Sequence, residues 1–193
     1  GQRKNTLIVF TSDNGGLHSG GNAYVSKVPP TPALSSNLPL RGQKNTLYEG
    51  GIRVCAFANW PGTLEPRKVS APLHACDWMP TLTNLAGWNR PKDFKQDGLD
   101  IWPVITGKLQ KPDPRNIYIP HPSGSVVNRA GWKLIEYKGK AKSELYHLEK
   151  DPYETSNLAV EMPDKLKELQ AILQELKKDD VTKLPEDLLK EKN

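Results

Sequence analysis

The residues best suited to chemistry stand in a short polar segment, residues 11–16 (TSDNGG), which directly follows an apolar run. Asp13 offers a carboxylate and Asn14 an amide carbonyl, and both are hard oxygen ligands of the kind that Ca²⁺ or Mg²⁺ takes. The two glycines allow a tight turn and a close approach to a bound group. The alternative is a plain surface turn, because Asn-Gly is a common turn dipeptide.

A second segment, residues 40–53 (LRGQKNTLYEGGIR), places a lysine in a glycine-flanked loop. The Lys44 ammonium could put a point charge against an oxyanion. The alternative is a charged surface loop in which Arg41 and Arg53 pair with Glu49 and brace the backbone. On the residues alone, both interpretations stay open.

Taken together, the two segments resemble the paired signature of the type I sulfatases, the arylsulfatase-like members of the alkaline phosphatase superfamily. Further segments match the family in the same order. These are residues 77–82 (DWMPTL), 97–100 (DGLD), 131–134 (GWKL), 144–148 (ELYHL), 151–154 (DPYE) and 157–158 (NL). The ordered matches extend over nearly the whole chain, so the sequence resembles the C-terminal portion of such an enzyme.

The resemblance implies a role for each matched position. Asp13 and Asn14 would ligate calcium, with magnesium as the alternative, and Lys44 would contact the sulfate of an aryl or carbohydrate sulfate ester. In this family a formylglycine hydrate attacks sulfur while the metal and cationic side chains neutralise the sulfate oxygens. Lys44 could also protonate the leaving oxygen. His121 is a candidate substrate contact, with a histidine in a surface turn as the alternative.

The family's nucleophile is absent from this sequence. Formylglycine forms from the first residue of a Cys/Ser-x-Pro-x-Arg motif, and neither Cys55 (CAFAN) nor Cys76 (CDWMP) begins one. The family's N-terminal acidic ligands are also missing, and Asn128 stands where many relatives have an arginine. We therefore expect the formylglycine in a missing N-terminal part, with the remainder of the catalytic domain as partner, and expect this chain alone to be inactive.

Two other functions remain as alternatives. A chain that keeps the fold without the chemistry would be a non-catalytic binding module, and a related hydrolase would act on phosphate esters. A Cys/Ser-x-Pro-x-Arg motif upstream in the parent gene would favour the sulfatase.

Composition agrees with a piece of a larger protein. Only 36% of the 193 residues are hydrophobic and 17 are proline, which is a low apolar content with many turns for a self-sufficient domain. The net charge of +5 is not clustered, so nucleic acid is not an expected partner. No apolar run reaches the length of a membrane span. The two cysteines lack the spacing of a zinc site and are expected as two buried thiols, with a single disulfide as the alternative.

The compartment is unknown from the residues. The family is commonly exported, to the periplasm, the lysosome or the medium, and the absence of an Asn-x-Ser/Thr sequon favours a bacterial source.

The first half of the chain should form the elements that position these residues. Residues 6–10 (TLIVF) are typical of a strand buried on both faces of a parallel sheet, and residues 52–58 predict a second strand before a turn at 60–62. Residues 17–46 predict a long loop over the site. Residues 77–87 predict a short helix that is capped by Asp77 and ended by glycine.

The second half predicts a small antiparallel sheet from residues 117–119, 132–137 and 145–148. Leucine spacing predicts an amphipathic helix over 163–178, packed on that sheet. The expected fold is α/β, a remnant of the alkaline-phosphatase-like sulfatase sheet followed by a small C-terminal α+β subdomain. We expect residues 1–110 in the catalytic domain and residues 111–193 in the subdomain.

Overall fold

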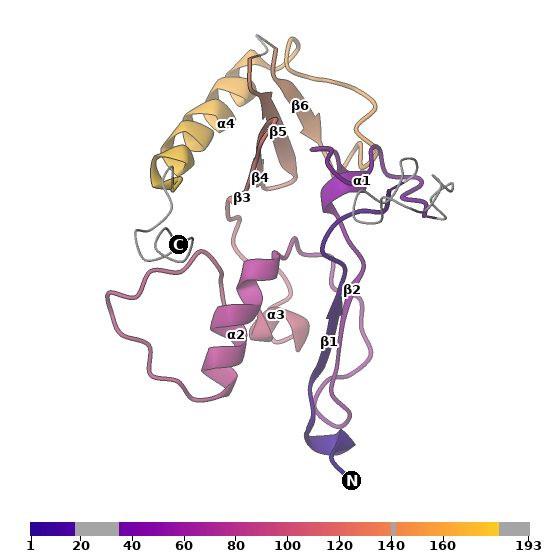
Figure 1. Ribbon diagram of the computed structural model, residues 1–193, viewed down its shortest axis with the longest axis vertical. Helices are drawn as coiled ribbons and strands as arrows, with labels where there is room; N and C mark the ends of the chain where they lie inside the picture. The colour runs from indigo at the N-terminus through magenta and orange to yellow at the C-terminus, as the bar shows by residue number, and fades with distance from the viewer. Residues whose placement is uncertain (18–34, 140–141, 182–193) are drawn as a thin grey trace, which may run out of the picture. The chain divides into compact units, whose positions relative to one another are not determined.

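The computed structural model (Figure 1) describes residues 1–17, 35–139 and 142–181. The chain forms two compact units, one of residues 1–13 and 54–114, the other of residues 14–53 and 115–193. The domain boundary expected at residue 110 stays a prediction. Most of the loop expected over residues 17–46 lies outside the described residues.

The first unit contains one pair of strands. A short 3-10 turn (Arg3–Asn5) precedes β1 (Ile8–Thr11), which pairs antiparallel with β2 (Ala56–Asn59). The prediction of a strand buried in a parallel sheet is wrong for this unit. Phe10 and Phe57 are 49% and 56% exposed and stack on each other with ring centroids 5.2 Å apart. An apolar, β-rich run predicts a strand, but burial depends on what covers its faces.

The helix expected over residues 77–87 is confirmed as α2 (Trp78–Leu85), which follows a 3-10 turn (Ala75–Asp77). Gly87, at φ +72°, ends it in the left-handed conformation that glycine tolerates. Asp77 does not cap α2 with its side chain. Its buried carboxylate instead accepts the backbone N–H groups of His74 at 2.7 Å and Leu99 at 3.0 Å, and thereby anchors the segment that leads to α3 (Trp102–Ile105).

The second unit contains a four-stranded antiparallel sheet in the order β3-β4-β5-β6. Its strands are β3 (Ile117–His121), β4 (Gly124–Arg129), β5 (Trp132–Tyr137) and β6 (Glu144–His147). The three predicted strands are confirmed. Strand β4 was missed because its sequence, GSVVNR, has only two large apolar residues between turn-forming ones. The predicted terminal helix is confirmed as α4 (Pro163–Leu176), followed by a 3-10 turn (Lys177–Asp179).

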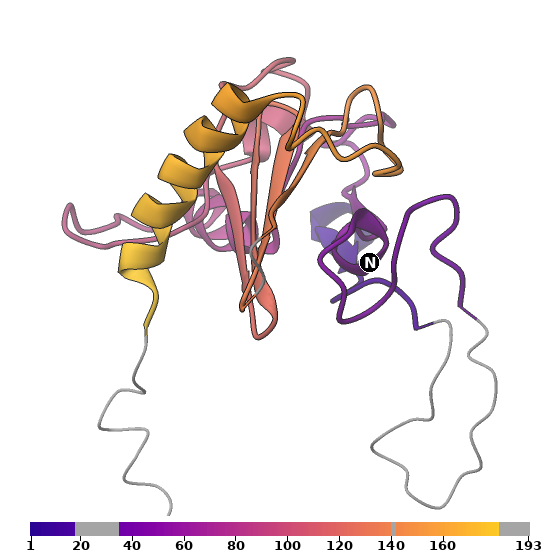
Figure 2. The same ribbon diagram turned by 90° about the horizontal axis from the view of Figure 1, so that it is seen from above.

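Both faces of this sheet are covered, as Figure 2 shows with α4 on one side and α1 (Glu49–Ile52) on the other. On the α4 side, Leu169 and Leu173 pack against Leu134 and its neighbours in β4 and β6. On the other side, Leu47 packs in a second cluster with Ile135 of β5. The segment expected to carry site chemistry is therefore part of the core. Because residues 49–52 are helical, β2 begins at residue 56 and not at the predicted residue 52.

Among the described residues, no helix combines the length and the apolar character needed to cross a bilayer.

Candidate functional site

Within the second unit, residues 14–16 of the first signature segment lie against the second segment. The backbone N–H of Lys44 donates to the carbonyl of Gly16 at 3.1 Å, and that of Gly15 donates to Gly51 at 2.9 Å. A Cβ atom on Gly15 would lie 1.8 Å from the Gly50 carbonyl oxygen. Glycine is required here because the two backbones cross too closely for a side chain.

Asp13 and Asn14 stand where the two units meet in the sequence, Asp13 as the last residue of one and Asn14 as the first of the next. Asp13 is exposed and Asn14 is half-buried. The Asn14 amide donates from Nδ2 to the Gly15 carbonyl at 3.2 Å. The loop is tied to the strand pair by a bond from Ser12 N–H to the Cys55 carbonyl at 3.2 Å.

The donor set of this loop was tested for a hard cation. A carboxylate and an amide oxygen are ligands of the right type, but calcium takes about six to eight oxygens. Within residues 1–17, 35–139 and 142–181, three or more His, Cys, Asp or Glu side chains nowhere form a group that could hold a metal. Asp13 and Asn14 are thus donors of a suitable type but too few to hold such an ion by themselves.

Lys44 lies in a turn whose flanking residues, Gln43 and Thr46, are hydrogen-bonded to each other. The hydroxyl of Thr46 donates to the Gln43 carbonyl at 2.7 Å and accepts from the Gln43 N–H at 3.0 Å. The side chain of Lys44 is half-buried, and with the described part of the chain its ammonium forms no hydrogen bond or ion pair. A cation on a braced backbone can meet an incoming anion with little reorganisation.

Sequence analysis missed Asn37, which joins the two segments. Its Oδ1 accepts the Gly16 N–H at 2.7 Å, and its Nδ2 donates to the Gly16 carbonyl at 2.8 Å and to the Gly42 carbonyl at 3.2 Å. Position was the sole signal in the sequence, because Asn37 stands shortly before residues 40–44. A polar residue among prolines and serines is otherwise typical of any loop.

A buried ionic cluster supports α1 from the sheet. The Lys133 ammonium on β5 lies 2.9 Å from Glu49 Oε1 and 2.7 Å from Glu154 Oε1. Glu154 Oε2 also accepts the Glu49 N–H at 2.7 Å, at the first turn of α1. The predicted pairing of Arg41 or Arg53 with Glu49 is wrong, because Lys133 shares the strand face of Ile135 and meets the helix that packs there.

Arg41 instead enters a cluster of tyrosines. Its Nη1 donates to the Tyr146 hydroxyl at 3.0 Å and to the Glu154 carbonyl at 2.8 Å, and its guanidinium lies 3.9 Å from the centroid of the Tyr48 ring. The hydroxyls of both tyrosines donate to Glu144. Burial, followed by the bond to Glu144, raises the pKa of Tyr146 far above its ordinary value. These motif residues therefore brace the loop that carries Lys44.

His121 lies at the end of β3, in the turn to β4. Its Nδ1 accepts the Ser123 N–H at 3.2 Å and lies 2.8 Å from the Ser123 hydroxyl. The ring thus has a local role in the hairpin, and its contact with a substrate stays a prediction.

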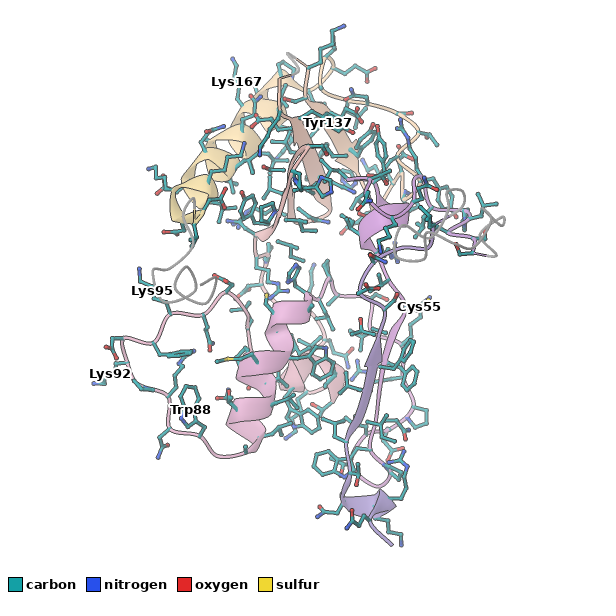
Figure 3. All side chains as sticks on the ribbon, viewed as in Figure 1. Cys55, Trp88, Lys92, Lys95, Tyr137 and Lys167 are labelled. Atoms are coloured by element: carbon teal, nitrogen blue, oxygen red, sulfur yellow. The ribbon has the colours of Figure 1, made fainter. Side chains whose placement is uncertain are left out.

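The two cysteines are free, but the prediction of two buried thiols is wrong for Cys55, which is exposed, while Cys76 is half-buried. Figure 3 shows Cys55 at the β1–β2 pair. The strand pair that was expected inside a sheet leaves this side chain uncovered. The sulfur of Cys76 lies 2.9 Å from Nδ1 of His74.

Comparison with known sequences gives consistent matches. The sequence model of a family described as Sulfatase matches residues 1–88. The chain is 33% identical over 181 residues to a sulfatase of Formosa agariphila, an alignment that covers 84% of this chain and 30% of that protein. It is 31% identical over 188 residues to human arylsulfatase A, which covers 82% of this chain and 34% of the relative. The chain thus spans about a third of the length of these relatives.

Solved structures show the same fold. A crystal structure of Ps i-CgsB in complex with a neocarrahexaose superposes with a TM-score of 0.75 and 26% identity, over 91% of this chain and 37% of that one. A Bacteroides thetaiotaomicron protein from a locus for glycosaminoglycan metabolism superposes with a TM-score of 0.74 over 91% of this chain and 39% of that one. At 23% identity, the second likeness concerns the fold alone.

Proposed function

Because this chain carries a region of the sulfatase family, we propose that the protein to which it belongs hydrolyses sulfate esters. The observation that carries the proposal is the Lys44 turn. The residue is half-buried, and the bond from its backbone N–H to the Gly16 carbonyl holds its backbone beside the Asn14 segment. A fixed cation next to oxygen ligands is an arrangement suited to a tetrahedral oxyanion.

Lys44 binds a sulfate oxygen in this proposal. Its charge stabilises the transition state, in which negative charge builds on the oxygens around sulfur. The same ammonium is the proposed proton donor to the leaving oxygen. A lysine suits both tasks, because its ammonium is a compact charge with three rotatable donors.

Asp13 and Asn14 are the proposed ligands of a calcium ion, with magnesium as the alternative. When bound, such an ion neutralises charge on the sulfate oxygens. The formylglycine nucleophile belongs, in this proposal, to a part of the protein outside this sequence, and the remaining ligands do too. His121 stays a proposed substrate contact.

A sulfated carbohydrate is the proposed substrate class, with an aryl sulfate as the alternative. The relative that was crystallised with a neocarrahexaose supports the carbohydrate. We extend the proposal to an exported enzyme, since export is common in this family.

The test is an assay of the full-length gene product on an aryl sulfate and on a carrageenan oligosaccharide, with and without calcium. We expect Lys44→Ala to lower kcat/KM by about a hundredfold or more, as for loss of one oxyanion donor. The matched control is Lys167→Ala, at an exposed position on α4 (Figure 3), which should leave kcat/KM within about twofold. Activity on phosphate esters but not on sulfate esters would contradict the proposal.

A further inference from the structure

Asn37 adds side-chain hydrogen bonds to the backbone bonds that join the Asn14 segment to the Lys44 segment. It is separated from Gly16 by 21 residues, yet its amide exchanges two hydrogen bonds with that one residue, at 2.7 and 2.8 Å. A third bond, at 3.2 Å, reaches Gly42 from the same amide nitrogen. The side chain therefore acts as a short piece of extended strand, offering both a donor and an acceptor to a neighbouring backbone.

Asn37 is itself held in place. Its own carbonyl accepts the Leu40 N–H at 2.8 Å, which closes a turn immediately before the Lys44 loop. Gly16 is the common point of the arrangement, because its carbonyl receives both the Asn37 amide and the Lys44 N–H. Moving Asn37 would therefore free Gly16 to shift and would weaken the bond that holds the Lys44 backbone to it.

From this geometry we propose that Asn37 is a positioning residue, whose amide sets where the Lys44 ammonium stands relative to Asn14. The inference deepens the proposed sulfate site and, for its effect on catalysis, rests on that proposed function. The arrangement depends on an amide. An aspartate has the same shape but cannot donate, so it would face the Gly16 and Gly42 carbonyls with a negative charge.

The first experiment does not depend on catalysis. Amide hydrogen exchange of Lys44 is measured in this chain, in Asn37→Ala and in Asn37→Asp. Because the Lys44 N–H is bonded to Gly16, we expect its protection to fall by about tenfold or more in both variants. The exchange of the Ile135 amide, in the centre of the sheet, reports whether the second unit is still folded. If either variant is unfolded, Asn37→Ser replaces it in the experiment.

Asn45→Asp is the matched control for charge. Asn45 is exposed, adjoins Lys44 and has φ +68°, a conformation that aspartate also adopts. It introduces the same charge as Asn37→Asp and leaves the amide bonds of Asn37 intact. Its Lys44 protection should stay within about twofold of the parent value. Equal loss of protection in Asn45→Asp and Asn37→Asp would overturn the proposal.

The second experiment measures the affinity of inorganic sulfate and the kinetics of the full-length enzyme. Asn37→Ala should weaken sulfate binding and lower kcat/KM by about tenfold or more, since a displacement of about 1 Å at a reacting group can cost about a hundredfold. Unchanged Lys44 exchange, or altered exchange with unchanged sulfate affinity, would overturn the proposal. If Lys44→Ala keeps full activity, the proposed function fails, and the exchange experiment still decides the role of Asn37 in holding the turn.

Discussion

The two units of this chain differ in how far they bury apolar residues that lie in strands. In the second unit, Leu134 and Ile135 of β5 are both 0% exposed, because α4 covers one face of the sheet and residues 47–52 cover the other. In the first unit, Phe10 and Phe57 sit in equally apolar strands and are about half exposed. Strand formation follows from local sequence, whereas burial follows from what packs on each face.

The difference extends to charged groups. The second unit buries Lys133 between two carboxylates, and both belong to segments that resemble family motifs. In the first unit the buried carboxylate of Asp77 accepts the backbone N–H groups of His74, three residues before it, and of Leu99, 22 residues after it. In the second unit a buried charge is thus paired with other charged side chains, whereas in the first the buried charge is bonded to backbone N–H groups. Motif residues with charged side chains can therefore be structural.

The largest effect should come from Lys133→Met, which tests this contrast directly. The substitution leaves two buried carboxylates, those of Glu49 and Glu154, without their shared cation. We expect the free energy of unfolding to fall by about 3–5 kcal/mol, measured by urea denaturation. The control is Lys177→Met, which removes a half-exposed ion pair with Glu136 and should cost about 1 kcal/mol or less. Equal losses would erase the contrast between buried and surface charges.

A pair of truncations compares the hydrophobic contacts of the two units. Leu173→Ala removes a fully buried side chain from the α4 face of the sheet, and we expect a loss of about 2–5 kcal/mol. Phe57→Ala removes a half-exposed ring whose partner is Phe10, and the expected loss is about 1 kcal/mol. Unfolding followed by amide exchange in each unit gives both values. A larger loss for Phe57→Ala would show that the strand pair is more than a local contact.

A smaller effect should appear in the pH dependence of the second unit. Burial raises the pKa of Glu154 above its ordinary value near 4.5, although the Lys133 ammonium lowers it. The folded state therefore keeps this proton to a higher pH than the unfolded chain does. The resulting stabilisation is present below the ordinary value and is lost as pH rises through the raised one.

Glu154→Gln should remove this loss of stability with rising pH. The measurement is the urea midpoint of unfolding of both proteins from about pH 4 to about pH 7. Glu175→Gln is the control, because Glu175 is an exposed residue on α4. Superimposable pH profiles of the parent chain and Glu154→Gln would contradict the assignment.

The smallest effect is expected at the surface of α4. Lys165 pairs with Glu168 one turn along and lies 5.7 Å from the centroid of the Trp132 ring. Lys165→Ala should lower the free energy of unfolding by about 0.5 kcal/mol, with the loss reduced further in high salt. A loss comparable to that of Lys133→Met would mean that exposure does not separate the two kinds of charge.

The sequence predicted α2, α4 and three strands of the sheet, because those elements carry a period or an apolar run within their own residues. It missed β4, whose two valines stand between turn-forming residues, and it placed β2 too early because α1 occupies residues 49–52. It also identified the two segments that carry Asn14 and Lys44. In the structure these segments lie side by side, joined by the bond from Lys44 N–H to the Gly16 carbonyl.

The sequence by itself determined which chemical groups this protein has and in what order they occur, since ligand type and motif spacing are properties of the chain. Tertiary structure alone decided which groups meet. Glu49 pairs with Lys133, 84 residues away, and not with the arginines beside it. Asn37 reaches across 21 residues to Gly16. Local periodicity carries no information about such contacts, because they arise only when segments far apart in the sequence pack together.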